Sequence, residues 1–166
     1  MDKVIIRPML ETDWVAVAKI YKEGIATGVA TFETKVPTYE AWDRAHMPSC
    51  RFVAVSEHIM LGWVALSPVS SRCVYGGVAE VSVYVSKESR GRGIGKLLLE
   101  HLILASENEG LWTLQSGVFP NNLASIKIHE SCGFRRIGKR EHIGKLNGQW
   151  IDNVLFERRS LVVGID

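Results

Sequence analysis

A strand that runs into a glycine-rich basic loop and then into an apolar helix is the feature that most constrains this chain. Residues 78–85 alternate strictly in polarity, which predicts a strand with valines on one face and polar or aromatic residues on the other. Residues 90–96 hold three glycines among three basic residues, and the apolar spacing of residues 94–105 predicts a helix directly afterwards. Such a unit turns backbone N–H groups and the positive end of a helix toward one point. It therefore predicts a binding site for an anion, most often phosphate.

The loop does not match the two best-known phosphate-binding motifs. The dinucleotide fingerprint needs Gly where Lys96 stands, and the Walker motif needs Gly at Arg90 and Ser or Thr at Leu97. A tight connection without a ligand is the alternative explanation of three glycines, but the basic residues favour an anion site. The residues predicted to hold the anion are Arg90, Gly91, Arg92, Gly93, Ile94, Gly95 and Lys96.

The remaining patterns predict one mixed α/β sheet covered by helices. Apolar spacing and capping residues predict helices at 14–21, 39–45 and 123–132, and β-rich runs predict strands at 4–7, 51–56, 62–66 and 111–118. The pair Asn147-Gly148 separates two further β-rich runs, 135–146 and 149–157, as in a two-residue hairpin. Because there is no internal repeat or linker, residues 1–166 are predicted to form a single domain of the α/β (α+β) class.

Composition excludes several classes of protein. With 46% hydrophobic and 23% charged residues among 166, the chain has the apolar content of a folded domain rather than of a disordered segment. No apolar run approaches the ~18 residues of a membrane span, and the N-terminus lacks the apolar core of a secretory signal. A net charge of +2 without a basic run gives no reason to expect a nucleic acid or a membrane surface as partner.

The three cysteines indicate a reducing environment. Cys50, Cys73 and Cys132 are odd in number and never form a Cys-x-x-Cys pair, so neither a disulfide framework nor a zinc cluster is predicted. No metal site is expected, and the cytoplasm is the predicted location.

Two segments resemble the signatures of the GNAT superfamily of N-acetyltransferases. Residues 90–95, Arg-Gly-Arg-Gly-Ile-Gly, are similar to its (Arg/Gln)-x-x-Gly-x-(Gly/Ala) motif, which lies between a strand and a helix as here. Residues 122–134 resemble its Asn-x-x-Ser-x-x-(Leu/Ile)-x-x-x-x-Gly-Phe segment. The resemblance implies a single domain with a mixed, mostly antiparallel sheet flanked by helices, and acetyl-CoA as the acetyl donor.

The same resemblance implies where acetyl-CoA would bind. Its pyrophosphate would lie on the loop 90–96, and its pantetheine arm would pair with the exposed backbone of Val83, Tyr84 and Val85 as an added strand does. An N–H group of that stretch would stabilise the developing oxyanion. On the helix that follows, Ser125 and Asn122 are the predicted contacts, and capping of that helix is the alternative role of Asn122.

Finer similarity points to one branch of the superfamily, the phosphinothricin/methionine-sulfone acetyltransferase group. The chain resembles this group in three places: Arg72-x-x-Tyr75-x-x-x-x-Glu80, the segment around Phe32, and Trp150-x-Asp152. The enzymes of the group acetylate the α-amine of small amino-acid analogues whose side chain ends in a tetrahedral sulfur or phosphorus group. One position differs, since Ile151 stands where the narrower phosphinothricin enzymes carry His. The choice among methionine sulfone, methionine sulfoximine and phosphinothricin is therefore left open.

Glu80 is the predicted catalytic base. It shares a strand face with Ser82, so it points toward the groove that acetyl-CoA would line, although a carboxylate in an alternating strand is otherwise expected simply to face solvent. A protonated amine must lose its proton before it attacks, either directly or through water. The resemblance favours Glu80 as the group that takes this proton.

Four residues are predicted to hold the amino-acid substrate. Arg72, in a loop with Tyr75, would bind the α-carboxylate or the sulfonyl or phosphinyl oxygens through a bidentate fork. Phe32 and Trp150 would wall the pocket. The alternatives are a solvated loop arginine and aromatic residues of the ordinary core.

Three functions compete on this evidence. The leading one is an acetyl-CoA-dependent N-acetyltransferase for small amino-acid analogues, acting by direct attack in a ternary complex and forming a homodimer as the family often does. Acetylation of a polyamine or of a protein N-terminus is the second, and Arg72 beside the cleft argues against a polyamine. A non-catalytic acyl-CoA-binding module is the third.

Overall fold

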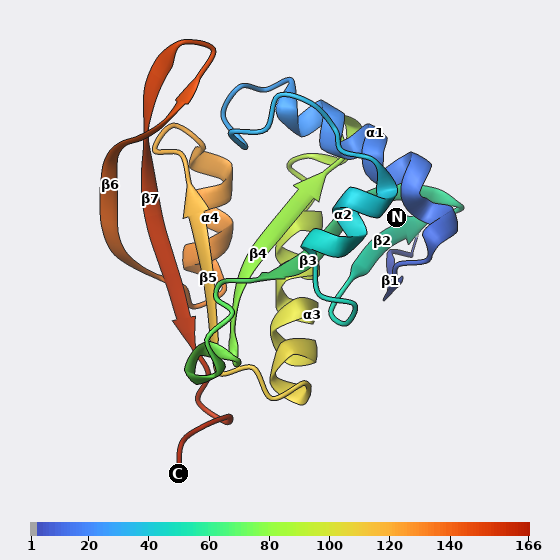
Figure 1. Ribbon diagram of the computed structural model, residues 1–166. Coiled ribbons are helices and arrows are strands. Elements are labelled where there is room, and N and C mark those ends of the chain that lie inside the picture. Colours follow the sequence, from blue (N-terminus) through green and yellow to red (C-terminus); the bar gives the residue numbers. More distant parts are fainter. Residues whose placement is uncertain (1–2) are drawn as a thin grey trace.

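A computed structural model describes residues 3–166 as one seven-stranded sheet with helices on both faces (Figure 1). Met1 and Asp2, which begin the N-terminal segment considered above, lie outside the described residues. The strands are β1 (Ile5–Pro8), β2 (Phe52–Ser56), β3 (Ile59–Pro68), β4 (Val78–Val85), β5 (Thr113–Val118), β6 (Arg135–Leu146) and β7 (Gln149–Arg159). The helices are α1 (Trp14–Ile25), α2 (Tyr39–Ala45), α3 (Ile94–Asn108) and α4 (Leu123–Ser131).

Every strand and helix predicted from the sequence is present, with ends that move by a few residues. The bounds of β4 and α2 agree with the prediction, and Thr38 explains where α2 begins, because its hydroxyl accepts a hydrogen bond from the Ala41 N–H at 3.2 Å. At the hairpin, Asn147 and Gly148 adopt φ angles of 49° and 81°, which an Asn-Gly pair tolerates. Local pattern was therefore sufficient to predict the elements.

The sheet has the strand order β1-β2-β3-β4-β5-β7-β6. Neighbouring strands are antiparallel except β4 and β5, which run parallel. This confirms the mixed, mostly antiparallel sheet. The last strand of the chain, β7, lies between β5 and β6, so the terminal hairpin joins the sheet by its second strand.

Two apolar layers hold the helices to the sheet. Helices α3 and α4 cover one face, where Leu98, Leu99 and Leu102 of α3 pack against strands β3 to β5 and β7. Helices α1 and α2 cover the other face over β2, β3 and β4, where Trp42 and Trp63 are fully buried. The two layers bury both faces of the middle of β3 and leave the two helix pairs on opposite sides of the sheet (Figure 1).

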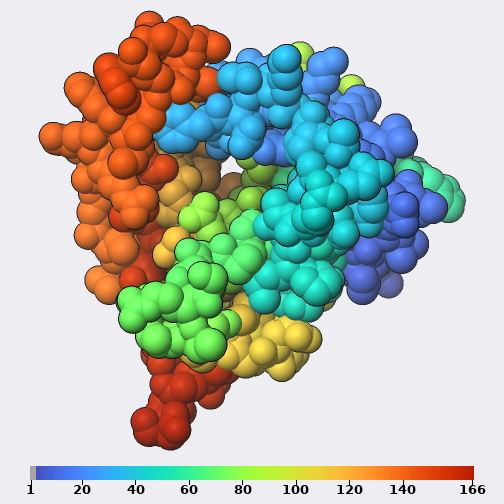
Figure 2. Space-filling model, in the orientation of Figure 1, coloured from blue at the N-terminus to red at the C-terminus, as the bar shows by residue number. Residues whose placement is uncertain are grey.

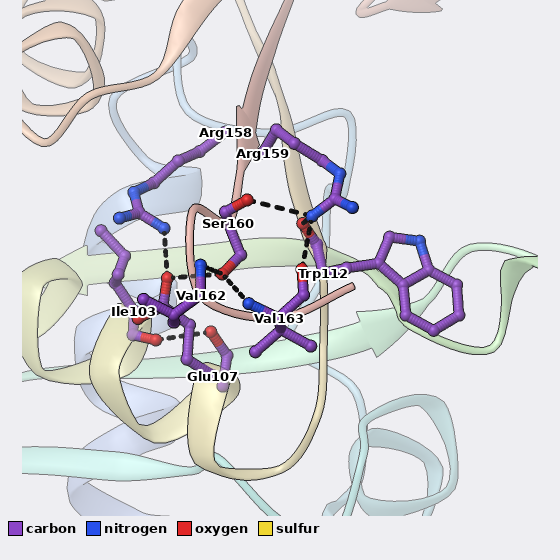
Figure 3. A network of polar contacts seen from close by, with 9 residues as sticks. Ile103, Glu107, Trp112, Arg158, Arg159, Ser160, Val162 and Val163 are labelled. Carbon is purple, nitrogen blue, oxygen red and sulfur yellow. Dashed lines mark hydrogen bonds and ion pairs between the residues drawn. The ribbon is translucent and has the colours of Figure 1, made fainter. Parts of the chain in front are cut away.

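A polar network ties the C-terminal segment to α3 (Figure 3). The Arg158 guanidinium donates to Glu107 at 3.0 Å, and the Ser160 hydroxyl donates to the same carboxylate oxygen at 2.9 Å. The N–H groups of Val162 and Val163 each donate to the Ser160 hydroxyl at 3.1 Å. This network closes the end of the sheet opposite to the site described below.

Residues 3–166 contain no helix that is long and apolar enough to cross a membrane. Within the same residues, no group of three or more His, Cys, Asp or Glu side chains is placed to hold a metal ion.

Candidate active site

The two parallel strands at the centre of the sheet part after three residue pairs. Strand β4 pairs with β5 only from Val78 to Glu80, opposite Thr113 to Gln115. Beyond that point, within residues 3–166, β4 continues to Val85 paired with β3 alone, and β5 continues to Val118 paired with β7 alone. The diverging strands are visible in Figure 1, and each presents an unpaired edge to the gap between them.

Backbone hydrogen bonds show which N–H groups of β4 face the gap. The Ser86 N–H donates to Leu61 on the β3 side at 2.8 Å, and the Gly77 carbonyl accepts from Thr113 on the β5 side at 3.1 Å. Because these directions alternate along a strand, the N–H groups of Val83 and Val85 point into the gap and that of Tyr84 points to β3. The gap therefore offers two free donors on β4, as an extended ligand that adds a strand would need.

The glycine-rich loop lies at the N-terminus of α3. Gly91 and Gly93 have φ angles of +75° and +79°, which side chains other than Gly rarely adopt, and a Cβ atom on either would meet open space. Gly93 is the N-cap of α3 and has no side chain to accept from the first turn, so the N–H groups of residues 94–96 have no intrahelical partner. Arg90 and Lys96 border the same groove. This cradle of free donors and cations fits the pyrophosphate of acetyl-CoA.

The third glycine of the loop has a different role. A Cβ atom at Gly95 would lie 2.8 Å from Ile128 Cδ1 and 3.4 Å from Val85 Cγ2, so Gly95 lets α3 lie close to α4 and β4. On α4, the Asn122 side chain accepts from the Ser125 N–H at 3.2 Å and caps the helix. Asn122 and Ser125 also line the groove. Helix α4 and the glycine-rich loop therefore form one wall of the groove, called the rear wall below.

Below that wall, His129 of α4 is fully buried against Phe134 and Phe156. Its Nδ1 lies 2.8 Å from the Ser125 carbonyl, and burial lowers the pKa of the ring. Nε2 has no hydrogen-bond partner within residues 3–166.

Glu80 lies where the two strands begin to part, on the face of β4 opposite to α3. Its side chain is exposed and lines the groove, and the Gln115 amide donates to Oε2 at 3.1 Å. Tyr84 of the same face is instead covered by α1, stacked on Trp63 with ring centroids 4.8 Å apart. Burial raises the pKa of the Tyr84 phenol. Glu80 is thus the ionisable group that β4 presents to the front of the groove.

The segment between α1 and α2 lines the groove and contacts the terminal hairpin. Phe32 packs edge-on against Phe119 with ring centroids 4.7 Å apart, and a Cβ atom on Gly144 of β6 would lie 2.9 Å from its ring. Figure 2 shows this segment meeting the terminal strands above a hollow in the surface. Phe32 therefore lines the groove on this side, and its predicted part in holding a substrate stays a prediction.

The walls enclose a groove of about 1130 Å³. Among the residues predicted from the sequence, those that line it are Phe32, Glu80, Val83, Tyr84, Val85, Arg90, Gly91, Gly93, Ile94, Gly95, Lys96, Asn122 and Ser125. Four predicted residues do not line it, namely Arg72, Tyr75, Arg92 and Trp150. Arg72 lies over the exposed Tyr75 ring at 5.5 Å, and Trp150 is 55% exposed beside Lys145. Their part in substrate binding stays a prediction.

Several residues that line the groove were not predicted from the sequence. These are Thr31, Glu33, Gly117, Phe119, Arg140, Asn153 and Leu155. They come from the bridging segment and from β5, β6 and β7, and no motif marks them. The alternation of β7 predicts that residues 153 and 155 share a face, but not that this face meets β4 across a gap.

Comparisons with known proteins agree with this geometry. The chain matches the model of the acetyltransferase (GNAT) family over residues 14–134. It is 31% identical over 160 residues to a phosphinothricin N-acetyltransferase of Alcaligenes faecalis, which covers 92% of this chain and 81% of that protein. It is 37% identical over 76 residues, 46% of this chain and 44% of the relative, to an L-methionine sulfoximine/L-methionine sulfone acetyltransferase of Pseudomonas aeruginosa.

A solved structure extends the agreement to the whole fold. A GNAT superfamily phosphinothricin acetyltransferase from Sinorhizobium meliloti, in complex with acetyl-CoA, superposes with a TM-score of 0.88 at 27% identity, covering 98% of this chain and 91% of that one. The chain belongs to the GNAT family and is an acyltransferase that takes acetyl-CoA as its donor. Within the family it falls in the phosphinothricin/methionine-sulfone group, which confirms the resemblance seen in the sequence.

Proposed function

We propose that this acetyltransferase acetylates the α-amine of small amino-acid analogues such as methionine sulfone, methionine sulfoximine or phosphinothricin. The observation that carries the proposal is one continuous groove with free donors and cations at the α3 end and Glu80 at the front. The names of the relatives point to the same substrates. Direct attack in a ternary complex is the proposed mechanism, because none of the three cysteines lines the groove as a nucleophile would.

Glu80 is proposed to take the proton of the attacking amine, directly or through water. Gln115 occupies Oε2, and Oε1 has no hydrogen-bond donor among residues 3–166, so one oxygen is available to the proton. The gap-facing N–H of Val83 or Val85 is proposed to donate to the developing oxyanion, a role for which the Tyr84 N–H points the wrong way. The chain thus supplies the base and the oxyanion donor from one strand.

A thiol-release assay with acetyl-CoA tests this proposal. Methionine sulfone, methionine sulfoximine and phosphinothricin are compared with spermidine and with a short peptide that has a free N-terminus. We expect the amino-acid analogues to give the highest kcat/KM. A preference for spermidine or for the peptide would replace the proposal by the polyamine or the N-terminal alternative, and acetyl-CoA binding without thiol release from any amine would leave a binding module.

We also propose that the protein is located in the cytoplasm and forms a homodimer. The odd number of cysteines supports a reducing location, and the exposed β6 at the sheet edge supports pairing of two copies. Light scattering on the purified chain should give twice the mass of one chain, and a monomer mass at micromolar concentration would exclude the homodimer.

A further inference from the structure

Among the arginines of β6 and β7, Arg140 is the one whose side chain has no hydrogen bond or ion pair within residues 3–166. Each of the others has a partner: Arg135 contacts Glu157 at 3.1 Å, Arg136 contacts Glu130 at 3.4 Å, Arg158 contacts Glu107 at 3.0 Å, and Arg159 donates to backbone carbonyls. The neighbouring Lys139 is also paired, with Glu141 at 3.4 Å and Asp152 at 3.5 Å. Of these five arginines, the one without a partner is also the one that lines the groove.

A β-bulge places Arg140 opposite Asn153. The register of β6 against β7 shifts between Arg140 and Gly144, so that Arg140 pairs with Asn153 and Gly144 with Ile151. Asp152 fixes the bulge, because its Oδ1 accepts from the His142 N–H at 2.8 Å. Residues directly opposite on two antiparallel strands point to the same face, so Arg140 and Asn153 face the groove together. Both are among the residues that line it.

The Asn153 side chain has a polar atom that nothing in the free enzyme satisfies. Its Oδ1 is buried without a hydrogen-bond partner within residues 3–166. The amide lies over Gly117 of β5, where a Cβ atom would come within 2.7 Å of both terminal atoms. Gly117 thus makes room for an amide at the gap between β4 and β5. Oδ1 only accepts hydrogen bonds, so the Asn153 amide can contact an oxyanion in the groove only by donating from Nδ2.

We propose that Arg140 and Asn153 form the subsite that binds an oxyanion group of the acceptor, either its α-carboxylate or its sulfonyl or phosphinyl oxygens. This inference rests on the proposed function. The acceptor carries a positive amine and a negative carboxylate, and the groove offers Glu80 and Glu33 for the first and Arg140 for the second. Arg140 supplies a planar fork of donors suited to a carboxylate or a phosphinyl group. The Nδ2 group of Asn153 adds a neutral hydrogen-bond donor beside it.

The test measures KM for methionine sulfone at saturating acetyl-CoA in Arg140→Gln, Arg140→Lys and Asn153→Ala. Loss of a charge-assisted hydrogen bond should raise this KM roughly 10- to 150-fold in Arg140→Gln, while the KM for acetyl-CoA stays unchanged. Arg140→Lys should recover part of the loss, because a point charge cannot reproduce the fork. Asn153→Ala should also raise KM but not destabilise the fold, since it removes an atom that has no partner in the free enzyme.

Arg136→Gln is the matched control, because Arg136 lies on the same strand and does not line the groove. It should leave both KM values at the wild-type level. The methyl ester of methionine sulfone separates the two sources of oxyanion. An effect of Arg140→Gln on the acid alone identifies the carboxylate, and an equal effect on acid and ester identifies the sulfonyl oxygens.

Two outcomes would overturn the inference: a wild-type KM for methionine sulfone in Arg140→Gln, or a rise in KM confined to Arg72→Gln. Unfolding midpoints of all variants exclude a general loss of structure. The inference and the proposed function fail in distinguishable ways. A wild-type enzyme that acetylates methionine sulfone with Arg140→Gln unaffected refutes the subsite alone, whereas a wild-type enzyme that acetylates only spermidine or the peptide refutes both.

Discussion

Replacing Gly144 by Ala should disturb the front wall of the groove without touching the acetyl-CoA side. Gly144 lies on β6 directly beneath the ring of Phe32. A Cβ atom there would be 2.9, 3.0 and 3.3 Å from three atoms of that ring. Ordinary carbon contacts are ~3.5–4.0 Å, so either the ring or the strand must move by about 0.5–1 Å.

The energetic effect follows from two opposing contributions. Overpacking of this kind costs about 1–3 kcal/mol, and replacing Gly by Ala within a strand returns about 0.5–1 kcal/mol of backbone entropy. The net loss of unfolding free energy should therefore lie between about 0 and 2.5 kcal/mol. In a chain of this size, that corresponds to a fall in Tm of at most about 10 °C.

The functional effect should fall on the acceptor alone. Phe32 packs on Phe119, and both line the front of the groove, so a displaced ring changes the shape of the acceptor pocket. We expect a several-fold rise in KM for methionine sulfone and an unchanged Kd for acetyl-CoA by calorimetry. Thermal unfolding of the same samples gives the stability change.

Gly138→Ala is the control for the backbone. Gly138 lies on the same strand, and a Cβ atom there meets nothing within 4 Å, so this variant should be as stable as wild type or slightly more stable. The Phe32→Ala background tests the cause. If Gly144→Ala lowers Tm as much in that background as in wild type, the added methyl group does not clash with the ring of Phe32, and the reasoning is refuted.

Three further variants test the other parts of the site and the fold. Gly93→Val forces a β-branched residue to a φ of +79° at the N-cap of α3, so calorimetry should show weaker acetyl-CoA binding by a folded protein, and unchanged affinity would argue against the anion loop. Glu80→Gln should lower kcat by roughly 100-fold or more with unchanged acetyl-CoA affinity, and wild-type turnover would exclude Glu80 as base. The hydrogen bond from Arg7 holds the pKa of Asp13 below its usual 3.8, so Asp13 stabilises the fold above that pH, and this stability is lost as the pH falls through the lowered pKa. Asp13→Asn should therefore flatten the acid limb of an unfolding curve against pH, and an unchanged limb would show that other carboxylates dominate.

The sequence alone determined the elements and the anion loop because both depend on local pattern. Alternation over residues 78–85 predicts β4 and which of its side chains share a face. The glycines at 91 and 93 predict the loop because their φ angles are a local requirement. Glu80 could be assigned to the groove because the strand alternation and the family resemblance agreed.

The acceptor side of the groove was decided by contacts between segments far apart in the chain. Counting back from the Asn147-Gly148 turn through a regular hairpin would place His142 opposite Asn153, but the bulge places Arg140 there. Similarity in the loop before β4 and near the hairpin pointed to Arg72 and Trp150, which do not line the groove. Phe32 reaches the groove because Gly144 on a distant strand leaves room for its ring.

Local sequence could not predict these contacts, because strand order, register and the parting of β4 from β5 depend on which surfaces pack together. Strand β7 lies between β5 and β6 because Val154 and Phe156 are buried in the α3 and α4 core, and this pairing separates residues 113–118 from the upper part of β4. No short stretch of the sequence contains both of the surfaces that pack together. The sequence therefore determined β4 and its glycine-rich loop, and the tertiary structure determined which side chains of β5, β6 and β7 line the groove beside them.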